Sequence, residues 1–219
     1  MKVQGIIFDM DGLMFDTERL GYFLWKKAVE EFGVNLTEDI FLETIGVSIQ
    51  KTKEIHEKYF GKDYPFEEIY KREIKLTEEY IEKNGVPIKD GLLDLLQFLE
   101  GKHLKKAVAT STERKNTEYL LEKAKIKEKF DAIICGDDIS KSKPEPDIFL
   151  CTAQKLNVNP KECIVLEDSD AGILAAKRAH MIPILIPDFK KPSSETIEMA
   201  YKVFNSLKEV KDFLEKVLK

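Results

Sequence analysis

Two carboxylates near the amino terminus are the residues of this chain best suited to chemistry. Asp9 and Asp11 follow the largely apolar run at residues 3–8, and Gly12 comes directly after them. An apolar run that stops at polar residues and a glycine is typical of a buried strand that leads into a loop. Ligands of parallel α/β sheets bind beyond the carboxyl ends of the strands. The pair is therefore placed to hold a hard divalent cation and to take part in phosphoryl transfer.

Polar side chains stand at three further places where predicted strands end or loops begin. They are Thr110 with Ser111, then Lys143 in a Ser-Lys-Pro loop, and finally Glu167 with Asp168. Taken singly, each is an ordinary turn or helix-capping residue, which is the more common use of these residue types. A doubly wound sheet gathers its strand ends along one edge, so the four groups together indicate one shared site.

An anionic nucleophile can approach a phosphate only if a cation lies between the two groups. We predict that Asp9 attacks phosphorus to form an aspartyl phosphate, and that Asp9 and Asp168 are carboxylate ligands of a divalent cation. Asp11 is predicted to protonate the leaving oxygen, to take a proton from water afterwards, and to offer its backbone carbonyl to the ion. The two opening carboxylates thus have different expected tasks.

The phosphoryl oxygens need hydrogen-bond donors and positive charge during the transfer. Substrate phosphate is expected to bind at Gly12, Thr110, Ser111 and Lys143, through the Thr110 hydroxyl, backbone N–H groups and the lysine ammonium. Glu167 is predicted to orient water bound to the ion. A divalent cation is the cofactor that this set of residues indicates.

The composition is that of an ordinary globular protein and narrows the choice of partners. The chain has 219 residues, of which 43% are hydrophobic and 34% charged, and its formal net charge is −5. This balance excludes disorder as the main state and disfavours nucleic acid or an anionic membrane as the partner. No apolar stretch reaches the roughly 18 residues of a membrane span. We therefore expect a cytoplasmic protein that acts on a small molecule.

Strand and helix patterns alternate along most of the chain. Alternation of this kind predicts an α/β fold, a doubly wound (Rossmann-like) parallel sheet. Residues 16–86 show only helical pieces broken by glycine and proline, which predicts an all-helical cap domain inserted after the first strand. The α/β core domain is expected at residues 1–15 and 87–219. Its strands are predicted at residues 3–9, 105–110, 131–135, 162–167, 182–186 and 202–204.

For a few side chains we expect a structural role and not a chemical one. Cys135 and Cys163 lie in apolar runs and are predicted to be buried thiols, without the spacing of a zinc site. Trp25 is predicted to pack between helices. His56 lies in a segment rich in lysine and glutamate and is predicted to be solvated.

The polar residues occur in an order that resembles the haloacid dehalogenase-like hydrolase superfamily. Residues 9–18, DMDGLMFDTE, are similar to its first motif, DxDGxxxDTE, and Thr110 stands where the second motif has Ser or Thr. Lys143 in the sequence SKPEPDIF resembles the third motif, and residues 166–172, LEDSDAG, resemble the fourth. The closest similarity is to the branch that contains β-phosphoglucomutase and pseudouridine-5′-phosphatase, with the helical insert in the cap position.

The resemblance implies a magnesium-dependent phosphoric monoester hydrolase with an aspartyl-phosphate intermediate at Asp9. It further implies a monomer that acts on a small phosphorylated metabolite, such as a sugar phosphate or a nucleoside or pseudouridine monophosphate. The acid at Asp11 favours phosphate-ester chemistry over halide release, because a leaving alkoxide needs a proton and a leaving halide does not.

Two alternatives remain open at this point. The first is a sugar-phosphate mutase of the β-phosphoglucomutase type. Such mutases have His at the position of Gly21 and Arg at the position of Ile49, in the cap loop at residues 46–49. The missing Arg would bind the second phosphate of a bisphosphate, so the sequence favours hydrolysis. The second, remote alternative is a binding protein without turnover, in which the clustered like charges would only destabilise the fold.

Overall fold

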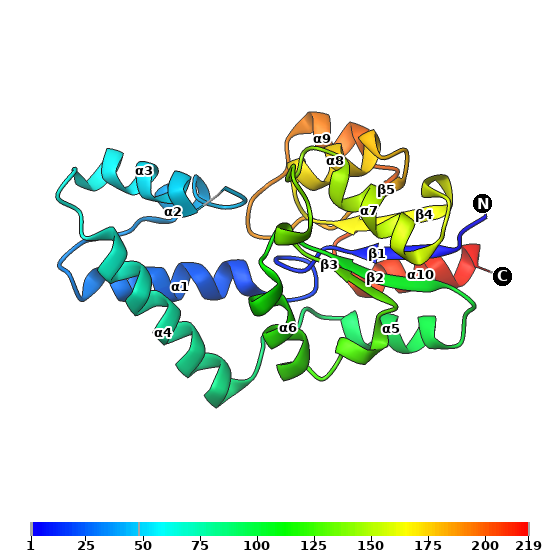
Figure 1. The fold of residues 1–219 in the computed structure, drawn as a ribbon, viewed down its shortest axis with the longest axis horizontal. Coiled ribbons are helices and arrows are strands. Elements are labelled where there is room, and N and C mark those ends of the chain that lie inside the picture. The colour runs from blue at the N-terminus through cyan, green and yellow to red at the C-terminus, as the bar shows by residue number, and fades with distance from the viewer. Residues whose placement is uncertain (1, 48, 219) are drawn as a thin grey trace. The chain divides into compact units, whose positions relative to one another are not determined.

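The computed structural model describes residues 2–47 and 49–218, which contain one six-stranded sheet. Neighbouring strands pair in parallel throughout, in the order β3-β2-β1-β4-β5-β6. Helices lie on both sides of this sheet (Figure 1). The predicted doubly wound α/β fold is therefore confirmed. The strands are β1 (Gly5–Phe8), β2 (Lys105–Ala109), β3 (Ala132–Ile134), β4 (Cys163–Glu167), β5 (Ile182–Leu185) and β6 (Lys202–Val203).

The chain divides into two compact units, one of Met1–Asp16 with Ile88–Lys219 and one of Thr17–Pro87. The first unit contains the sheet. Its helix α9 was not predicted, because it has only six residues, of which Thr196 alone is buried, and these give little periodicity. A hydrogen bond from Thr196 N to the Ser193 side chain caps it. The α-helices of this unit are α5 (Leu92–Glu100), α6 (Arg114–Lys123), α7 (Asp147–Leu156), α8 (Asp170–Arg178), α9 (Ser194–Met199) and α10 (Leu207–Val217).

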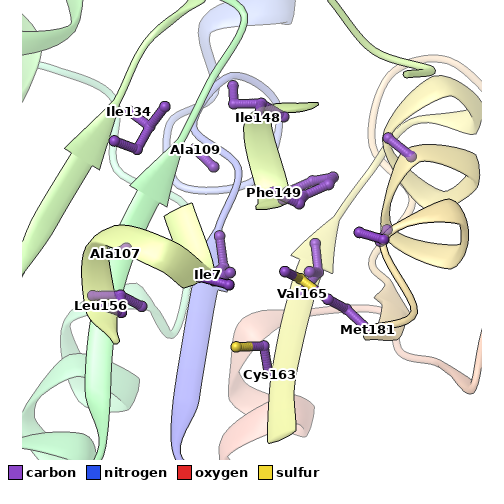
Figure 2. Packing of buried hydrophobic residues seen from close by; sticks show 14 of the residues in the cluster. Ile7, Ala107, Ala109, Ile134, Ile148, Phe149, Leu156, Cys163, Val165 and Met181 are labelled. Atoms are coloured by element: carbon purple, nitrogen blue, oxygen red, sulfur yellow. The ribbon is translucent and has the colours of Figure 1, made fainter. Parts of the chain in front are cut away.

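One face of the sheet packs against α7 and α8. Figure 2 shows Ile148 and Phe149 of α7 lying over Ile7 of the central strand, beside Val165. All four side chains are fully buried, as expected for parallel strands covered on both faces. The other face of the sheet is covered by α5 and α10, which contact each other. The central strand β1 is thus held from both sides, which makes its carboxyl end a rigid platform.

Two cysteines of the sheet-containing unit are buried. Cys135 and Cys163 are both fully buried and free, which confirms their prediction as core thiols. Burial raises the pKa of Cys163 to about 11, so this thiol stays protonated at neutral pH. Cys163 lies at the start of β4, packed in the cluster that Figure 2 draws.

The second unit is all-helical and consists of α1 (Thr17–Glu30), α2 (Glu38–Leu42), α3 (Ile49–Phe60) and α4 (Phe66–Asn84). Its core is aromatic. Trp25 of α1 stacks on Tyr70 of α4, with 6.0 Å between ring centroids, and also contacts Phe66. The prediction that Trp25 packs between helices is confirmed.

The prediction that His56 is solvated is wrong. Its side chain is fully buried, and its ring meets the edges of Trp25 and Phe66 at centroid distances of 5.1 and 5.7 Å. Nδ1 lies 3.1 Å from the Tyr64 hydroxyl. Burial lowers the pKa of His56 to about 4, so the ring is neutral at pH 7. The charged neighbours along the sequence concealed this, because on a helix they point to other faces.

Among the described residues, no helix combines the length and the apolar character needed to cross a membrane.

Candidate active site

The strand register places the predicted polar residues together. Phe8 pairs with Val108 on one side and with Leu166 on the other. The carboxyl ends of β1, β2 and β4 therefore lie at nearly one level, and Asp9, Thr110 and Asp168 directly follow them. The strand order reverses at β1, with β2 on one side and β4 on the other, so this is the topological switch point where such sheets bind ligands.

Asp9 follows β1 directly and is buried, with a relative exposure of 7%. Its backbone N–H donates to the Leu166 carbonyl at 3.0 Å, which extends the sheet pairing by one residue and fixes where the side chain begins. Lys143 Nζ donates to Asp9 Oδ1 at 2.5 Å. Burial raises the pKa of Asp9, and the ammonium group of Lys143 opposes that rise. A divalent cation beside Asp9 would favour its ionised, nucleophilic form.

Lys143 joins the ends of three strands. Besides Asp9, its Nζ donates to Glu167 Oε1 at 2.7 Å and to the Ala109 carbonyl at 3.2 Å. Only 6% of this side chain is exposed. Burial alone would lower the pKa of Lys143, but the carboxylates of Asp9 and Glu167 outweigh it and raise that pKa above its usual range. Lys143 is therefore charged at neutral pH.

Glu167 is held from two sides. One oxygen accepts from Lys143, and the other accepts from the backbone N–H groups of Asp168 and Ser169 at 3.0 Å each and from the Ser169 hydroxyl at 2.8 Å. A Cβ on Gly172 would lie 1.8 Å from the Glu167 carboxyl group, so the glycine of the LEDSDAG segment makes room for this side chain. This immobilised carboxylate is consistent with an orienting role.

Asp11 receives its contacts from the loop after β2. Thr112 Oγ1 donates to Asp11 Oδ2 at 2.6 Å, and Thr110 Oγ1 lies 3.5 Å from the same oxygen. Thr110 Oγ1 in turn accepts from the Thr112 N–H at 3.1 Å. Thr112 was not predicted from the sequence, although residues 110–112, Thr-Ser-Thr, carry two threonine hydroxyls two positions apart just after a strand. The hydroxyl of Thr112 fixes the rotamer of Asp11.

The remaining predicted phosphate-binding positions differ in exposure. Thr110 is 1% exposed, whereas Ser111 is exposed at the start of the loop. Gly12 is buried and has φ +77°, a conformation that favours glycine. Its N–H donates to the Phe15 carbonyl at 2.9 Å, so it closes the turn after Asp11. The structure thus brings Asp9, Asp11, Thr110 and Lys143 together and leaves Ser111 at the rim.

The residues at the ends of β1 and β4 suit a hard cation. Carboxylate oxygens of Asp9, Glu167 and Asp168 all lie within 4.8 Å of one another. An all-oxygen donor set of this kind is the type that Mg²⁺ takes. A Cβ on Gly12 would lie only 2.2 Å from Asp168 Oδ2, so the glycine leaves the space that the Asp168 carboxylate occupies. The fit supports the predicted pairing of Asp9 and Asp168 around an ion.

Replacing Gly12 by Ala is expected to disturb this cluster directly. The new methyl group would force the Asp168 carboxylate to move, and we expect Mg²⁺ affinity to fall about tenfold or more, the usual effect of displacing a metal ligand or its support. Isothermal titration with Mg²⁺ measures this change.

Gly33→Ala is the matched control for the backbone. Gly33 has φ +72°, but a Cβ there would meet nothing within 4 Å. Both substitutions should cost roughly 1 kcal/mol of unfolding free energy for the positive φ. Only Gly12→Ala should weaken Mg²⁺ binding; equal and unchanged affinities in the two variants would contradict the role of Gly12.

Two positions of the helical unit bear on the choice between hydrolase and mutase. Gly21 lies within α1, where a Cβ would approach the Phe41 ring at 3.5 Å. Ile49 begins α3 and is 45% exposed. Ser48 of the same loop lies outside the described residues. Neither Gly21 nor Ile49 can supply a charge for a second phosphate.

Sequence comparisons identify the family. A profile described as haloacid dehalogenase-like hydrolase matches residues 6–186. A Thermotoga maritima protein named phosphorylated carbohydrates phosphatase is 30% identical over 217 residues, which cover 97% of this chain and 91% of that protein. A β-phosphoglucomutase of Bacillus subtilis is 29% identical over 195 residues, covering 83% of this chain and 82% of the mutase.

A structural comparison agrees. A structure from Thermotoga maritima, solved under a provisional β-phosphoglucomutase name, superposes with a TM-score of 0.83 at 27% identity, over 98% of this chain and all of that one. The resemblance proposed from the four motifs is confirmed, and the predicted enzyme class, phosphoric monoester hydrolase, agrees with the named phosphatase. The chain belongs to the haloacid dehalogenase-like hydrolase family.

Proposed function

We propose that this chain is a Mg²⁺-dependent phosphatase that hydrolyses a small phosphorylated metabolite through an aspartyl phosphate on Asp9. The observation that carries the proposal is the buried contact of Lys143 with Asp9 and Glu167, beside the Asp168 carboxylate. A nucleophilic carboxylate, a fixed lysine and two further carboxylates at one sheet edge are the parts that phosphoryl transfer needs.

The reaction is proposed to run in two steps. In the first, an Asp9 oxygen attacks phosphorus, the bond from phosphorus to the leaving oxygen breaks, and protonated Asp11 gives its proton to that oxygen. In the second, water attacks the phosphorus of the aspartyl phosphate, Asp11 takes a proton from that water, and inorganic phosphate leaves with Asp9 restored. Asp11 thereby regains the proton that it lost, so the cycle closes.

The surrounding residues stabilise charge during both steps. Lys143 offsets the negative charge of Asp9 and of the phosphoryl oxygens, and the Thr110 hydroxyl and the Ser111 N–H are the proposed donors to those oxygens. The Gly12 N–H, which the sequence predicted as a further donor, is taken up by the Phe15 carbonyl. A Mg²⁺ ion held by Asp9, Asp168 and the Asp11 carbonyl would neutralise charge between nucleophile and phosphate. The hydrogen bond from Thr112 keeps the Asp11 carboxyl group directed at the reacting atoms.

We propose the substrate class from the names of the relatives. A phosphatase of phosphorylated carbohydrates covers nearly the whole chain, which favours a sugar phosphate, with a nucleoside or pseudouridine monophosphate as the other member of the class. The side chains that select the substrate are proposed to come from the helical unit Thr17–Pro87.

A turnover screen with product identification tests this proposal. We expect Mg²⁺-dependent release of inorganic phosphate from p-nitrophenyl phosphate and from one or more sugar or nucleoside monophosphates. No phosphate release from any ester, with Mg²⁺ present, would overturn the phosphatase proposal.

A sugar-phosphate mutase is the second candidate, because a β-phosphoglucomutase aligns over most of the chain. The same screen separates the two, since a mutase would interconvert glucose 1- and 6-phosphates with a bisphosphate primer and release little phosphate. We expect no isomerised product, because Gly21 and Ile49 lack the groups that would hold the second phosphate.

A further inference from the structure

A second, partly buried ion pair lies beside the proposed cation site, and the mechanism above does not use it. Lys89 Nζ donates to Asp188 Oδ1 at 2.5 Å. The Asp188 side chain is only 1% exposed and that of Lys89 is 23% exposed. Asp16 Oδ1 lies 3.8 Å from the same ammonium group. Taking the Asp188 carboxylate out of water is unfavourable, so its charge is costly to keep unless it is compensated or has a use.

The backbone holds both members of the pair in place. Asp188 follows β5 by three residues, and the Ile186 N–H donates to the Glu167 carbonyl at 2.7 Å, which ties this segment to the end of β4. The Lys89 N–H donates to the Met14 carbonyl at 2.9 Å, in the turn that follows Asp11. The pair therefore links the segments that carry the first and fourth motifs.

Gly12 shows how close Asp188 comes to the cation ligands. The position where a Gly12 Cβ would stand lies 2.2 Å from Asp168 Oδ2 and 3.4 Å from Asp188 Oδ2. Carboxylate oxygens from the ends of two strands thus approach one small space. Their charges repel each other unless a cation or a lysine is near.

Each of the two lysines pairs with a different set of carboxylates at this edge of the sheet. Lys143 contacts Asp9 and Glu167, whereas Lys89 contacts Asp188 and lies near Asp16. Asp168 lies between the two groups, since it belongs to the cluster with Asp9 and also approaches the space that Asp188 approaches.

We infer that Lys89 is a resident counter-charge of the cation site: it neutralises Asp188, stabilises the metal-free acidic cluster and thereby lowers the affinity for Mg²⁺. This inference rests on the proposed function, because it assumes that Mg²⁺ binds beside Asp9 and Asp168. Asp188 supplies long-range attraction for the ion, and Lys89 cancels part of it.

Substitution of the two residues of this ion pair should change Mg²⁺ affinity in opposite directions. Lys89→Met removes the positive charge beside Asp188, so Mg²⁺ affinity should rise roughly tenfold, the scale of a unit charge acting on a divalent ion under strong solvent screening. Asp188→Asn removes the attraction, so affinity should fall by a similar factor. The double variant should bind Mg²⁺ less tightly than Lys89→Met, because the charge that Lys89 masks is gone.

Titration calorimetry and thermal unfolding of the whole chain, with Mg²⁺ as the only added ligand, test the inference without reference to turnover. We expect Lys89→Met to melt below wild type without Mg²⁺ and to gain more in Tm than wild type when Mg²⁺ is added. Lys105→Met is the matched control, because Lys105 also pairs with an aspartate, Asp131, at 2.8 Å on the same unit. Its Mg²⁺ affinity should equal that of wild type.

The outcomes separate this inference from the proposed function. If Lys89→Met binds Mg²⁺ as weakly as wild type or more weakly, the counter-charge role is wrong while the phosphatase proposal stands. Should Lys89→Met fail to fold, Asp188→Asn alone decides, since unchanged affinity in that variant also overturns the inference. If wild type itself binds no Mg²⁺, the cation requirement of the proposed function fails first.

Discussion

Replacement of Asp9 by Asn is expected to lower phosphate release by roughly 10³-fold or more, because the proposed nucleophile is lost. An amide is neutral and does not attack phosphorus, yet it has nearly the shape of the carboxyl group. It can still accept a hydrogen bond from Lys143, whose second carboxylate partner, Glu167, is unchanged. The expected variant is therefore folded and inactive.

Two further measurements test whether the loss of activity in Asp9→Asn comes from loss of the nucleophile. Acid-quenched wild-type enzyme should carry one phosphoryl group, detected by mass spectrometry on the peptide that contains Asp9, and Asp9→Asn should carry none. Asp212→Asn, on the exposed side of α10, serves as the control and should keep full activity. Full activity of Asp9→Asn would exclude the aspartyl-phosphate mechanism altogether.

Replacement of Asp11 by Asn is expected to have the second largest effect, and its size should depend on the leaving group. Loss of general acid–base catalysis typically costs 10²–10⁴-fold, roughly the decrease expected with a sugar phosphate. p-Nitrophenolate leaves without a proton, so its release in the first step should stay fast. The second step still needs Asp11 to accept a proton from water.

Rapid-mixing kinetics separate these steps. With p-nitrophenyl phosphate, Asp11→Asn should give a burst of about one p-nitrophenolate per enzyme and then slow turnover, as expected when a covalent intermediate accumulates. With a sugar phosphate, no burst of the free sugar should appear. Equal losses on both substrates, with no burst on either, would show that Asp11 is not the acid of the first step.

Much of the fold and part of the site follow from local patterns. The apolar runs that end at Asp9 and at Glu167 are short and bounded by turn residues, so the strands are recognised without tertiary information. Parallel strands align their carboxyl ends, and this rule alone predicts that Asp9, Thr110 and Asp168 share one edge. The comparisons confirm the family that the four motifs indicated.

Other features depend on contacts between distant segments, which no local pattern records. His56 is buried although its neighbours along the chain are charged, because Trp25 and Phe66 from two other helices cover it. Thr112 was missed as the hydrogen-bond partner of Asp11, since the pair is 101 residues apart in sequence.

By itself, the sequence determined the doubly wound sheet, the family and the set of acidic residues at the strand ends, because periodicity and motif order are local properties. Only the tertiary structure decided which charges meet. The contact of Lys143 with Asp9 spans 134 residues and that of Lys89 with Asp188 spans 99. The physical reason is that the energy of a buried charge depends on its partner in space, and packing of the whole sheet brings that partner into place.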